Sequence, residues 1–275
     1  MHTHMDFSIN PAEIIRSFYR NKQLIWQLTK REIIGRYRGS MLGIAWSFFN
    51  PLIMLAVYTF VFSVVFKARW DIGTESKTGF ALALFIGLIV HGILAECMTR
   101  APSLILNNVN YVKKVIFPLE ILPWVVMGST LFHSMISLSA WSLFFIIVNQ
   151  TYYWTAIFIP LVLLPLILLT MGISWILSSI GVFLRDINQF IGVVSMILLF
   201  MAPVFYPITM LPESYQKLLY LNPLTFFIEQ ARVVLLMEGF PNWFGLFISF
   251  LISGMVAWLG FVWFQKTRKG FADVL

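Results

Sequence analysis

Residues of the types that perform catalysis are scarce in this 275-residue chain, and none of them falls into a known catalytic motif. The dipeptide Gly-Lys never occurs, which excludes the phosphate-binding loop of nucleotide-hydrolysing proteins. His-Glu-x-x-His, Gly-x-Ser-x-Gly and Gly-x-Gly-x-x-Gly are also missing. Cys97 is the single cysteine, so neither a disulfide nor a thiolate metal site is expected. We predict that the chain is not an enzyme and has no catalytic residue or metal ligand.

Ionisable residues inside apolar stretches are the next candidates, because such residues usually have a function when they lie within a membrane. His91 and His133 are of this kind, but neither has a carboxylate at helical spacing in its own stretch. We therefore favour neutral, hydrogen-bonded histidines that help helices to pack. Glu96 and Arg100 are four residues apart, and we expect them to form an ion pair.

The elements that position these residues follow from the composition, which is 59% hydrophobic and 11% charged. A soluble domain has about 25% charged residues, and a helix that crosses a membrane needs about 20 apolar ones. Residues 121–184 contain no charged side chain and divide into two crossings at Asn149–Trp154. The sequence predicts an all-α integral membrane protein with six transmembrane helices at about 41–66, 79–98, 119–148, 154–183, 187–206 and 243–265.

Six crossings place both ends of the chain on one side of the membrane, and the cations indicate which side. Fourteen Lys and Arg residues fall on the side of the termini, namely Arg16, Arg20, Lys22, Lys30, Arg31, Arg36, Arg38, Arg100, Lys113, Lys114, Arg185, Lys266, Arg268 and Lys269. The opposite side has five, which are Lys67, Arg69, Lys77, Lys217 and Arg232. Because basic loops stay inside, both termini are predicted to be cytoplasmic.

The N-terminal region, residues 1–40, precedes this six-span domain of residues 41–275. Asn10-Pro11 is typical of a helix start, and a break is expected near Asn21. Apolar and basic residues then alternate up to Tyr37, which predicts an amphipathic helix lying in the membrane interface. A solvated arm beside the membrane is the alternative. The residues assigned to this interface helix are Trp26, Arg31, Arg36, Tyr37 and Arg38.

Three connections carry further signals. Residues 99–118 have a short amphipathic pattern that suits either a partner-binding helix or a plain connector, and Arg185-Asp186 lies in a tight polar turn. Residues 207–242 contain an apolar run, Leu218–Ile228, that is too short to cross, and Asn222-Pro223 should separate two short helices. We interpret them as a re-entrant hairpin with a Glu229–Arg232 pair, although an ordinary surface loop also fits.

Aromatic residues make up 17% of the chain and recur at helical spacing within the predicted spans. Tyr58, Phe62 and Phe66 are four residues apart on the first span, while Phe200, Phe205 and Tyr206 end the fifth. Such side chains commonly face lipid or pack helices together. The alternative is a conduit whose aromatic faces pack against sugar rings.

Four motifs resemble a known family. They are Arg36-Tyr37-Arg38-x-Ser40-x-Leu42-Gly43-x-x-Trp46 with Pro51, Lys113-Lys114-Val-Ile-Phe-Pro118, Phe183-Leu184-Arg185-Asp186, and Tyr220-Leu-Asn222-Pro223. In this order they resemble the membrane subunit of polysaccharide-exporting ATP-binding-cassette transporters, the permeases for O-antigen, capsule and teichoic acid. The resemblance covers nearly the whole chain.

The resemblance implies a homodimer in the bacterial cytoplasmic (inner) membrane, bound to a separate cytoplasmic ATPase that holds ATP and Mg²⁺. The chain itself would hold no cofactor and bind no nucleic acid; its partners would be the ATPase, a second copy, membrane lipids and lipid-linked polysaccharide. A permease for a small amphiphile such as a drug is the first alternative. An ion-coupled secondary transporter is a weaker one, because acidic residues avoid the centres of the spans.

The resemblance also implies roles for particular residues. The coupling helix 99–118 and the following cytoplasmic turn would contact the ATPase through Asn107, Asn110, Lys113, Lys114, Arg185 and Asp186. Channel-lining candidates are Phe49, Tyr58, Phe62, Phe66, Phe200, Phe205 and Tyr206. The hairpin 207–242 would form an outer gate with Tyr215, Tyr220, Asn222, Pro223, Phe226 and Phe227.

Overall fold

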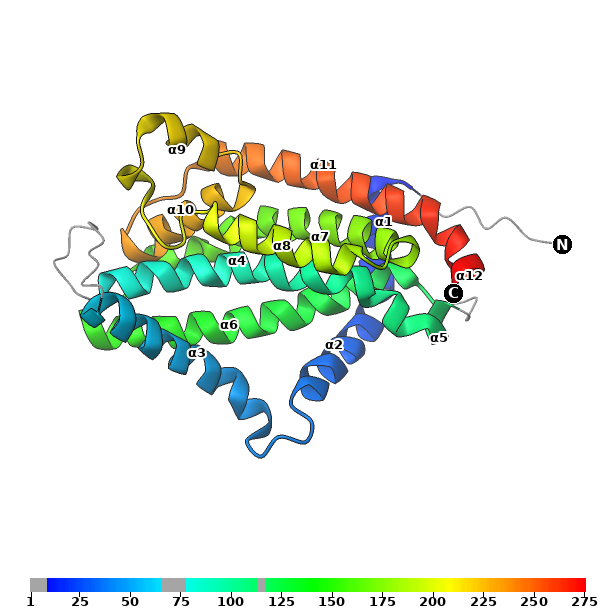
Figure 1. The fold of residues 1–275 in the computed structure, drawn as a ribbon, viewed down its shortest axis with the longest axis horizontal. Helices are drawn as coiled ribbons and strands as arrows, with labels where there is room; N and C mark the ends of the chain where they lie inside the picture. Colours follow the sequence, from blue (N-terminus) through cyan, green and yellow to red (C-terminus); the bar gives the residue numbers. More distant parts are fainter. Residues whose placement is uncertain (1–8, 66–77, 113–116) are drawn as a thin grey trace.

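The computed structural model describes residues 9–65, 78–112 and 117–275, and this part of the chain consists of helices and connections without a β-strand. Phe66, Lys113 and Lys114 lie outside the described residues. The long helices lie side by side in an elongated bundle (Figure 1). Helices α1, α5 and α12 gather at one end of this bundle and α9 lies at the other.

Five helical stretches in the described chain are long and apolar enough to cross a membrane, as the charge-free runs predict. They are Gly43–Phe62 with α3 (Trp46–Tyr58), Gly79–Leu104 (α4), Leu119–Asn149 with α6 (Leu122–Asn149), Trp154–Phe183 with α7 (Ile159–Phe183), and Trp243–Val274 with α11 (Trp243–Thr267) and α12 (Phe271–Val274). Helix α8 (Ile187–Phe200) is apolar but has 14 residues. The sixth crossing therefore remains a prediction.

Helix α4 forms the centre of the bundle, with residues of α6, α7, α8 and α10 packed around it. Trp141 of α6 is buried against it and donates a hydrogen bond from Nε1 to the Leu82 carbonyl oxygen, 3.0 Å away. Helices α7 and α11 touch backbone to backbone, because a Cβ atom at Gly260 would overlap the Gly172 carbonyl oxygen. The tightest packing thus joins α4, α6, α7 and α11.

Helices α3 and α8 are held more loosely on opposite sides of α4. Only 11% of the most apolar window of Gly43–Phe62 is buried. Pro51 lies inside α3, which diverges from the bundle toward its N-terminal end and forms a V with α2 (Figure 1). Exposed apolar side chains cover both helices, namely Phe48, Phe49, Ile53, Met54 and Val57 on α3 and Phe190, Val193, Met196, Ile197 and Phe200 on α8.

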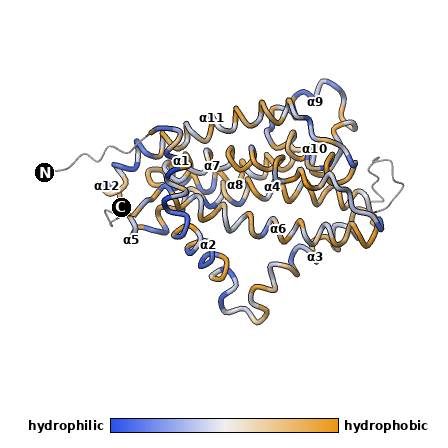
Figure 2. The backbone as a smooth tube through the Cα atoms, turned by 180° about the vertical axis from the view of Figure 1, so that it is seen from behind, coloured by the Kyte–Doolittle hydropathy of each residue, from blue (hydrophilic) through white to orange (hydrophobic). Residues whose placement is uncertain are grey.

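The N-terminal region forms two helices, α1 (Pro11–Arg20) and α2 (Lys22–Arg36), separated at Asn21 as the sequence predicts. Asn10 caps α1 by accepting a hydrogen bond from the Ala12 backbone N–H at 2.9 Å. Figure 2 shows that α1, α2 and the turn after α2 are mostly hydrophilic, whereas the long helices are mostly hydrophobic. An interface position for α2 remains a prediction, because the structure contains no membrane.

The segment predicted as one coupling helix at 99–118 has a different form. Helix α4 continues through Leu104, and a 3₁₀ turn η3 (Leu106–Asn108) and the short α5 (Val109–Val112) follow. The extension of α4 is favoured by Arg100, which pairs with Glu96 one turn earlier. The described part of this segment is therefore a helix end followed by two short turns.

The hairpin region also forms two short helices, α9 (Glu213–Leu219) and α10 (Pro223–Leu236), which separate at Asn222-Pro223 as predicted. The Asn222 side chain caps α10 by accepting from the Leu224 backbone N–H at 3.0 Å. Helix α10 is largely buried against α4 and α7. Whether the pair enters the membrane is not tested by this packing, so the re-entrant arrangement remains a prediction.

Candidate functional site

An ionic network joins the N-terminal helix α2 to the end of α4. The predicted pair between Arg100 and Glu96 is present at 3.3 Å. Arg100 also contacts Glu32 of α2, and Glu96 contacts Arg36 at the end of α2. These side chains are 24–38% exposed, so water and ions reach the network. The network ties α2 to the helix that leads into the predicted coupling segment.

Close packing strengthens this attachment on a second side of α2. Gly128 of α6 faces Thr29, and a Cβ atom at position 128 would lie 2.9 Å from the Thr29 side chain. Next to this contact in the sequence of α2, Ile25 and Leu28 are buried in a cluster with Ile121 and Val125. Helix α2 is therefore docked on α6 as well as on α4.

Tyr37 and His133 meet where α2 ends. The Tyr37 hydroxyl lies 3.3 Å from His133 Nδ1, and the two rings are in edge contact with centroids 5.8 Å apart. Burial raises the pKa of the Tyr37 phenol, so this hydroxyl stays protonated at neutral pH and can donate to the imidazole. The hydrogen-bonded role predicted for His133 is confirmed.

The second predicted packing histidine, His91, joins α4 to α8. Its Nε2 atom lies 3.1 Å from the carbonyl oxygen of Ser195, which accepts the hydrogen bond. A carbonyl oxygen cannot donate, so Nε2 carries the proton in this contact. The hydrogen-bonded packing role is confirmed for His91 too.

The predicted coupling segment, residues 99–118, contacts α2 through Tyr111, which the sequence analysis did not single out. Arg31 Nη2 donates to the Tyr111 hydroxyl at 3.0 Å, and the Tyr111 ring stacks on Phe117 with centroids 4.2 Å apart. A polar cavity of about 170 Å³ lies between α2, α4, η3, α5 and α6, lined in part by Arg31, Glu32, Arg100, Ser103, Asn107 and Tyr111. In the sequence, only the position of Tyr111 between a group of three asparagines and two lysines could have indicated it.

The other coupling candidates are exposed at the same end of the bundle. Asn107 and Asn110 are exposed on the segment after α4, and Arg185 and Asp186 are exposed in the turn between α7 and α8. The start of α8 packs near the end of α4, since Ile191 is buried with Met98 and Ala101. The described candidates thus share one end of the molecule but lie on separate elements.

The aromatic channel candidates form two groups, one on each side of α4. Tyr58 ends α3, and Phe62 lies in the π-helical segment η2 (Thr59–Val65) that follows. Their ring centroids are 6.4 Å apart, and Phe62 also stacks on Phe80 at 5.0 Å. At the end of α8, Phe200 stacks on Phe205 at 5.5 Å, and the Tyr206 hydroxyl donates to the Phe200 carbonyl oxygen at 2.9 Å. Phe49 and Phe200 are 44% and 59% exposed. The exposed rings, rather than Phe62, are free to meet another molecule.

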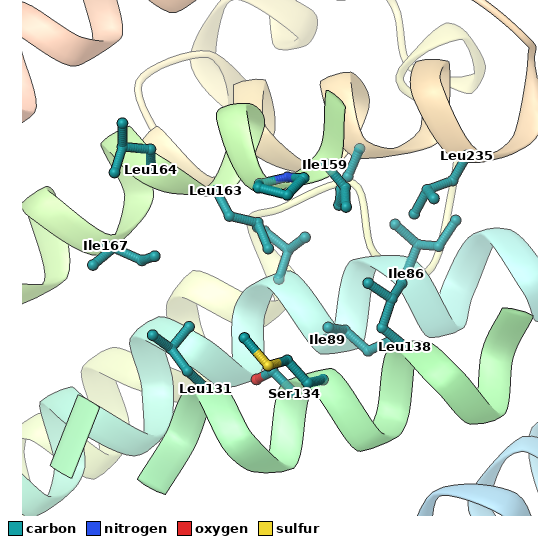
Figure 3. A pocket seen from close by; sticks show the side chains of 14 residues that line it. Ile86, Ile89, Leu131, Ser134, Leu138, Ile159, Leu163, Leu164, Ile167 and Leu235 are labelled. Atoms are coloured by element: carbon teal, nitrogen blue, oxygen red, sulfur yellow. The ribbon is translucent and has the colours of Figure 1, made fainter. Parts of the chain in front are cut away.

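Two cavities lie along these helices. One of about 330 Å³ between α3, α4 and α6 is lined in part by Asn50, Tyr58, Phe85, Glu96, His133 and Ser137. The other, of about 310 Å³ between α4, α6, α7 and α10, is almost wholly apolar, and Figure 3 shows Ile86, Ile89, Leu131, Leu163 and Leu164 around it. Among the described residues, no group of histidine, cysteine or carboxylate side chains could hold a metal ion.

The outer-gate candidates divide into exposed and packed residues. Tyr215 and Tyr220 are each 60% exposed, whereas Phe227 is buried. Asn222 is buried and donates from Nδ2 to the Leu198 carbonyl oxygen at 2.9 Å, which fixes the hairpin to α8. Pro223 opens α10, and the Phe226 ring touches Gly245 closely.

Arg232 has a larger role than the sequence indicates. The predicted pair with Glu229 is present at 3.0 Å. Arg232 is also completely buried and donates to the carbonyl oxygens of Ala83 at 3.1 Å and Val204 at 3.2 Å. Helix α10 is consequently attached to α4 and to the loop after α8.

Comparison with known proteins gives one consistent result. The family model described as ABC-2 type transporter matches residues 23–236. The O-antigen export system permease protein RfbA of Myxococcus xanthus is 27% identical over 262 residues, which cover 94% of this chain and 98% of that protein. Two proteins of the same name from Klebsiella pneumoniae are 26% and 27% identical, each over 92% of this chain and 95% of the relative.

Proposed function

This chain belongs to the ABC-2 type transporter family, and on that basis we propose that it is the membrane-spanning subunit of an ATP-driven exporter of lipid-linked polysaccharide. The observation that carries the proposal is the similarity to O-antigen export permeases along almost the whole chain. The missing phosphate-binding loop agrees with it, because ATP hydrolysis then falls to a separate subunit that binds ATP and Mg²⁺.

We propose six crossings, of which α8 supplies the fifth. Its 14 residues span about 21 Å, which is less than the hydrocarbon thickness of about 30 Å. However, the chain continues beside α4 after α8 ends. Ile191 packs near Ala101, Ser195 meets His91, and Val204 meets Arg232 near Ala83. Residues 83–101 of α4 rise about 27 Å, so this pairing supports a complete crossing.

The end of the bundle with α1, α5 and α12 would face the cytoplasm of a bacterial inner membrane. The excess of cations at this end supports that orientation. The ATPase would dock on the segment after α4 and on the turn at Arg185-Asp186, which are exposed there. The hairpin of α9 and α10 would then form the gate at the outer end.

A second copy of the chain would complete the translocation path. Helices α3 and α8 expose apolar and aromatic side chains on either side of α4, and such faces in a bundle require a partner or lipid. Exposed aromatic rings such as Phe49 and Phe200 suit contact with sugar faces without fixed hydrogen bonds. We propose that these faces of two subunits enclose the polymer.

The test is co-purification with a candidate ATPase from the same cell, followed by ATP hydrolysis measured with and without lipid-linked glycan in liposomes. A stable complex stimulated by glycan is expected. Stimulation by an amphiphilic drug but not by glycan would overturn the polysaccharide assignment and favour the drug permease. Transport driven by an ion gradient without any ATPase would overturn both.

Charge reversal at Lys113 and Lys114 tests the docking assignment separately. The double variant K113E/K114E should lose ATPase association, because the segment that presents these cations would meet the ATPase. Lys217→Glu, a charge reversal at the opposite end, is the matched control. Normal assembly and export by the double variant would refute the assigned docking site.

A further inference from the structure

Glu120 directly follows the C-terminal end of the coupling segment, residues 99–118, and is almost completely buried. It occupies the 3₁₀ turn η4 (Leu119–Ile121) and is 6% exposed. Its Oε1 atom accepts a hydrogen bond from the Ser17 hydroxyl at 3.0 Å, and its Oε2 atom accepts one from Arg268 Nη1 at 2.7 Å. Ser17 belongs to α1, and Arg268 lies in the turn η7 (Arg268–Gly270) directly after α11. The carboxylate therefore joins both ends of the chain to the coupling segment.

The backbone of Glu120 adds a connection to α7. Trp175 Nε1 donates to the Glu120 carbonyl oxygen at 3.0 Å. The Trp175 side chain is buried and makes edge contacts with Trp124 and Phe261, at centroid distances of 5.9 Å and 5.3 Å. One residue thus fixes α1, α7 and the end of α11 to a single point.

This arrangement differs from the other ion pairs that hold the coupling segment. The network of Glu32, Glu96 and Arg100 at its entry is partly exposed, so its pairs can exchange with water. The Glu120 and Arg268 side chains are only 8% and 10% exposed. Buried ion pairs add little net stability over apolar packing, but they tolerate few geometries. The chain at Glu120, after the segment, is consequently held more rigidly than the chain at Glu96 and Arg100, where the segment begins.

We propose that Glu120 is a positioning residue that makes the coupling segment, α1 and the α7–α11 pair move as one body when the ATPase changes state. The inference rests on the proposed function, because it assigns the driving force to the ATPase. Packed elements transmit a displacement only where they are held in discrete arrangements, and the Glu120 contacts supply such a joint. Without the Glu120 contacts, the segment would move without displacing α1 or the α7–α11 pair.

The experiment uses the full complex of this chain with its ATPase and measures glycan exported per ATP hydrolysed. We expect Glu120→Ala and Arg268→Ala each to lower this ratio about tenfold, within the usual range of coupling between sites. ATP hydrolysis per assembled complex should stay near wild type, even where breaking the buried pair lowers the yield of folded chain. The exchanged pair E120R/R268E should regain most of the ratio, because Ser17 can accept from an arginine as readily as it donates to a carboxylate.

The matched control is the ion pair of Glu13 and Arg20, which lies on the same helix α1 at 3.0 Å with Arg20 exposed. E13Q/R20Q should leave the ratio unchanged. A merely structural role for Glu120 would lower export, hydrolysis and complex yield in parallel, and the exchange would then rescue the yield rather than the ratio. Either that pattern or a wild-type ratio in Glu120→Ala overturns the proposal.

A second readout needs neither substrate nor fully stable variants. Backbone hydrogen exchange of the complex is compared with and without a non-hydrolysable nucleotide, in wild type and in the milder variant Ser17→Ala. Nucleotide should alter exchange in the coupling segment, α1 and the cytoplasmic turns of α7 and α11, and Ser17→Ala should uncouple α1 alone. If nucleotide alters the exchange of α1 in Ser17→Ala as much as in wild type, the proposed joint at Glu120 is refuted. If wild type shows this response but exports no glycan, only the proposed substrate fails.

Discussion

At the scale of single residues, Arg232 shows how a buried cation can be satisfied between elements. Its guanidinium reaches one carboxylate and two backbone carbonyl oxygens, which belong to α4 and to the loop after α8. Glu229 is 30% exposed and can be hydrated when it is unpaired. The two members of this pair are therefore unequal, because only the loss of the arginine removes hydrogen bonds to buried carbonyl oxygens.

We predict that Arg232→Ala lowers the free energy of unfolding by about 3 kcal/mol, near the lower limit for breaking a buried pair. Glu229→Gln should cost about 1 kcal/mol, because the amide oxygen still accepts from the arginine. Denaturant titration of the purified proteins in detergent measures both. Lys217→Gln on the exposed face of α9 is the control and should have almost no effect. Equal losses for the two pair members would refute the asymmetry.

At the scale of elements, small residues decide how closely the helices approach one another. Gly128 faces Thr29 where α2 docks on α6, and Gly260 faces Gly172 where α7 meets α11. Both contacts have so little space that an added methyl group must displace a neighbour. They differ in what has to move, which is a side chain at Gly128 and a backbone at Gly260.

The α2–α6 contact gives a prediction with an internal rescue. Gly128→Ala should destabilise the docked helix by about 1–2 kcal/mol, because the new methyl group lies too close to the Thr29 side chain. In the Thr29→Ala background the nearest atom would be the residue 29 Cβ at 3.5 Å, which is an ordinary contact. Protease protection of the N-terminal region measures docking. Protection that stays lost in the double variant would show that the Thr29 side chain is not the obstacle.

The α7–α11 contact should respond differently, because no side chain can yield there. Gly260→Ala is expected to cost about 1–3 kcal/mol through helix separation. Gly254 on the same helix has no atom within 4 Å of the position a Cβ would take. Gly254→Ala should therefore be neutral or stabilising by up to about 1 kcal/mol from helix propensity. Thermal unfolding in detergent compares the two, and equal shifts would contradict the close backbone contact.

Sequence patterns predicted the elements better than their contacts. Charge-free runs, the break at Asn21 and the division at Asn222-Pro223 depend on local chemistry, so they could be found without a structure. The pairing of Glu32 with Arg100 joins residues 68 positions apart, and no periodicity indicates it. Phe62 likewise fits the predicted aromatic stripe, yet it stacks on Phe80 of the neighbouring helix. Which face of a helix meets its neighbour is decided by three-dimensional packing.

At the scale of the whole molecule, a tightly packed group of α4, α6, α7, α10 and α11 is flanked by the less buried helices α3 and α8. The turn before α3 contains Gly39 and Gly43, which both have positive φ angles that other residues rarely adopt. Helix α2 before this turn is fixed by ion pairs and close packing. In a transport cycle we expect α3 to change its angle about this turn while α2 stays docked.

The number of crossings can be tested on the whole molecule by labelling with a membrane-impermeant thiol reagent. Cys97 is buried and is first replaced by serine, after which single cysteines are placed at the exposed positions Thr151, Asp186, Ser214 and Ala272. Six crossings with cytoplasmic termini predict labelling of intact cells at 151 and 214, and labelling at 186 and 272 only after permeabilisation. If α8 did not cross, position 214 would share the side of 186, and α11 would carry position 272 to the outside. The pairing of α8 and the loop after it with residues 83–101 of α4 favours the first result, because a segment that follows its neighbour over about 27 Å must end near the opposite surface.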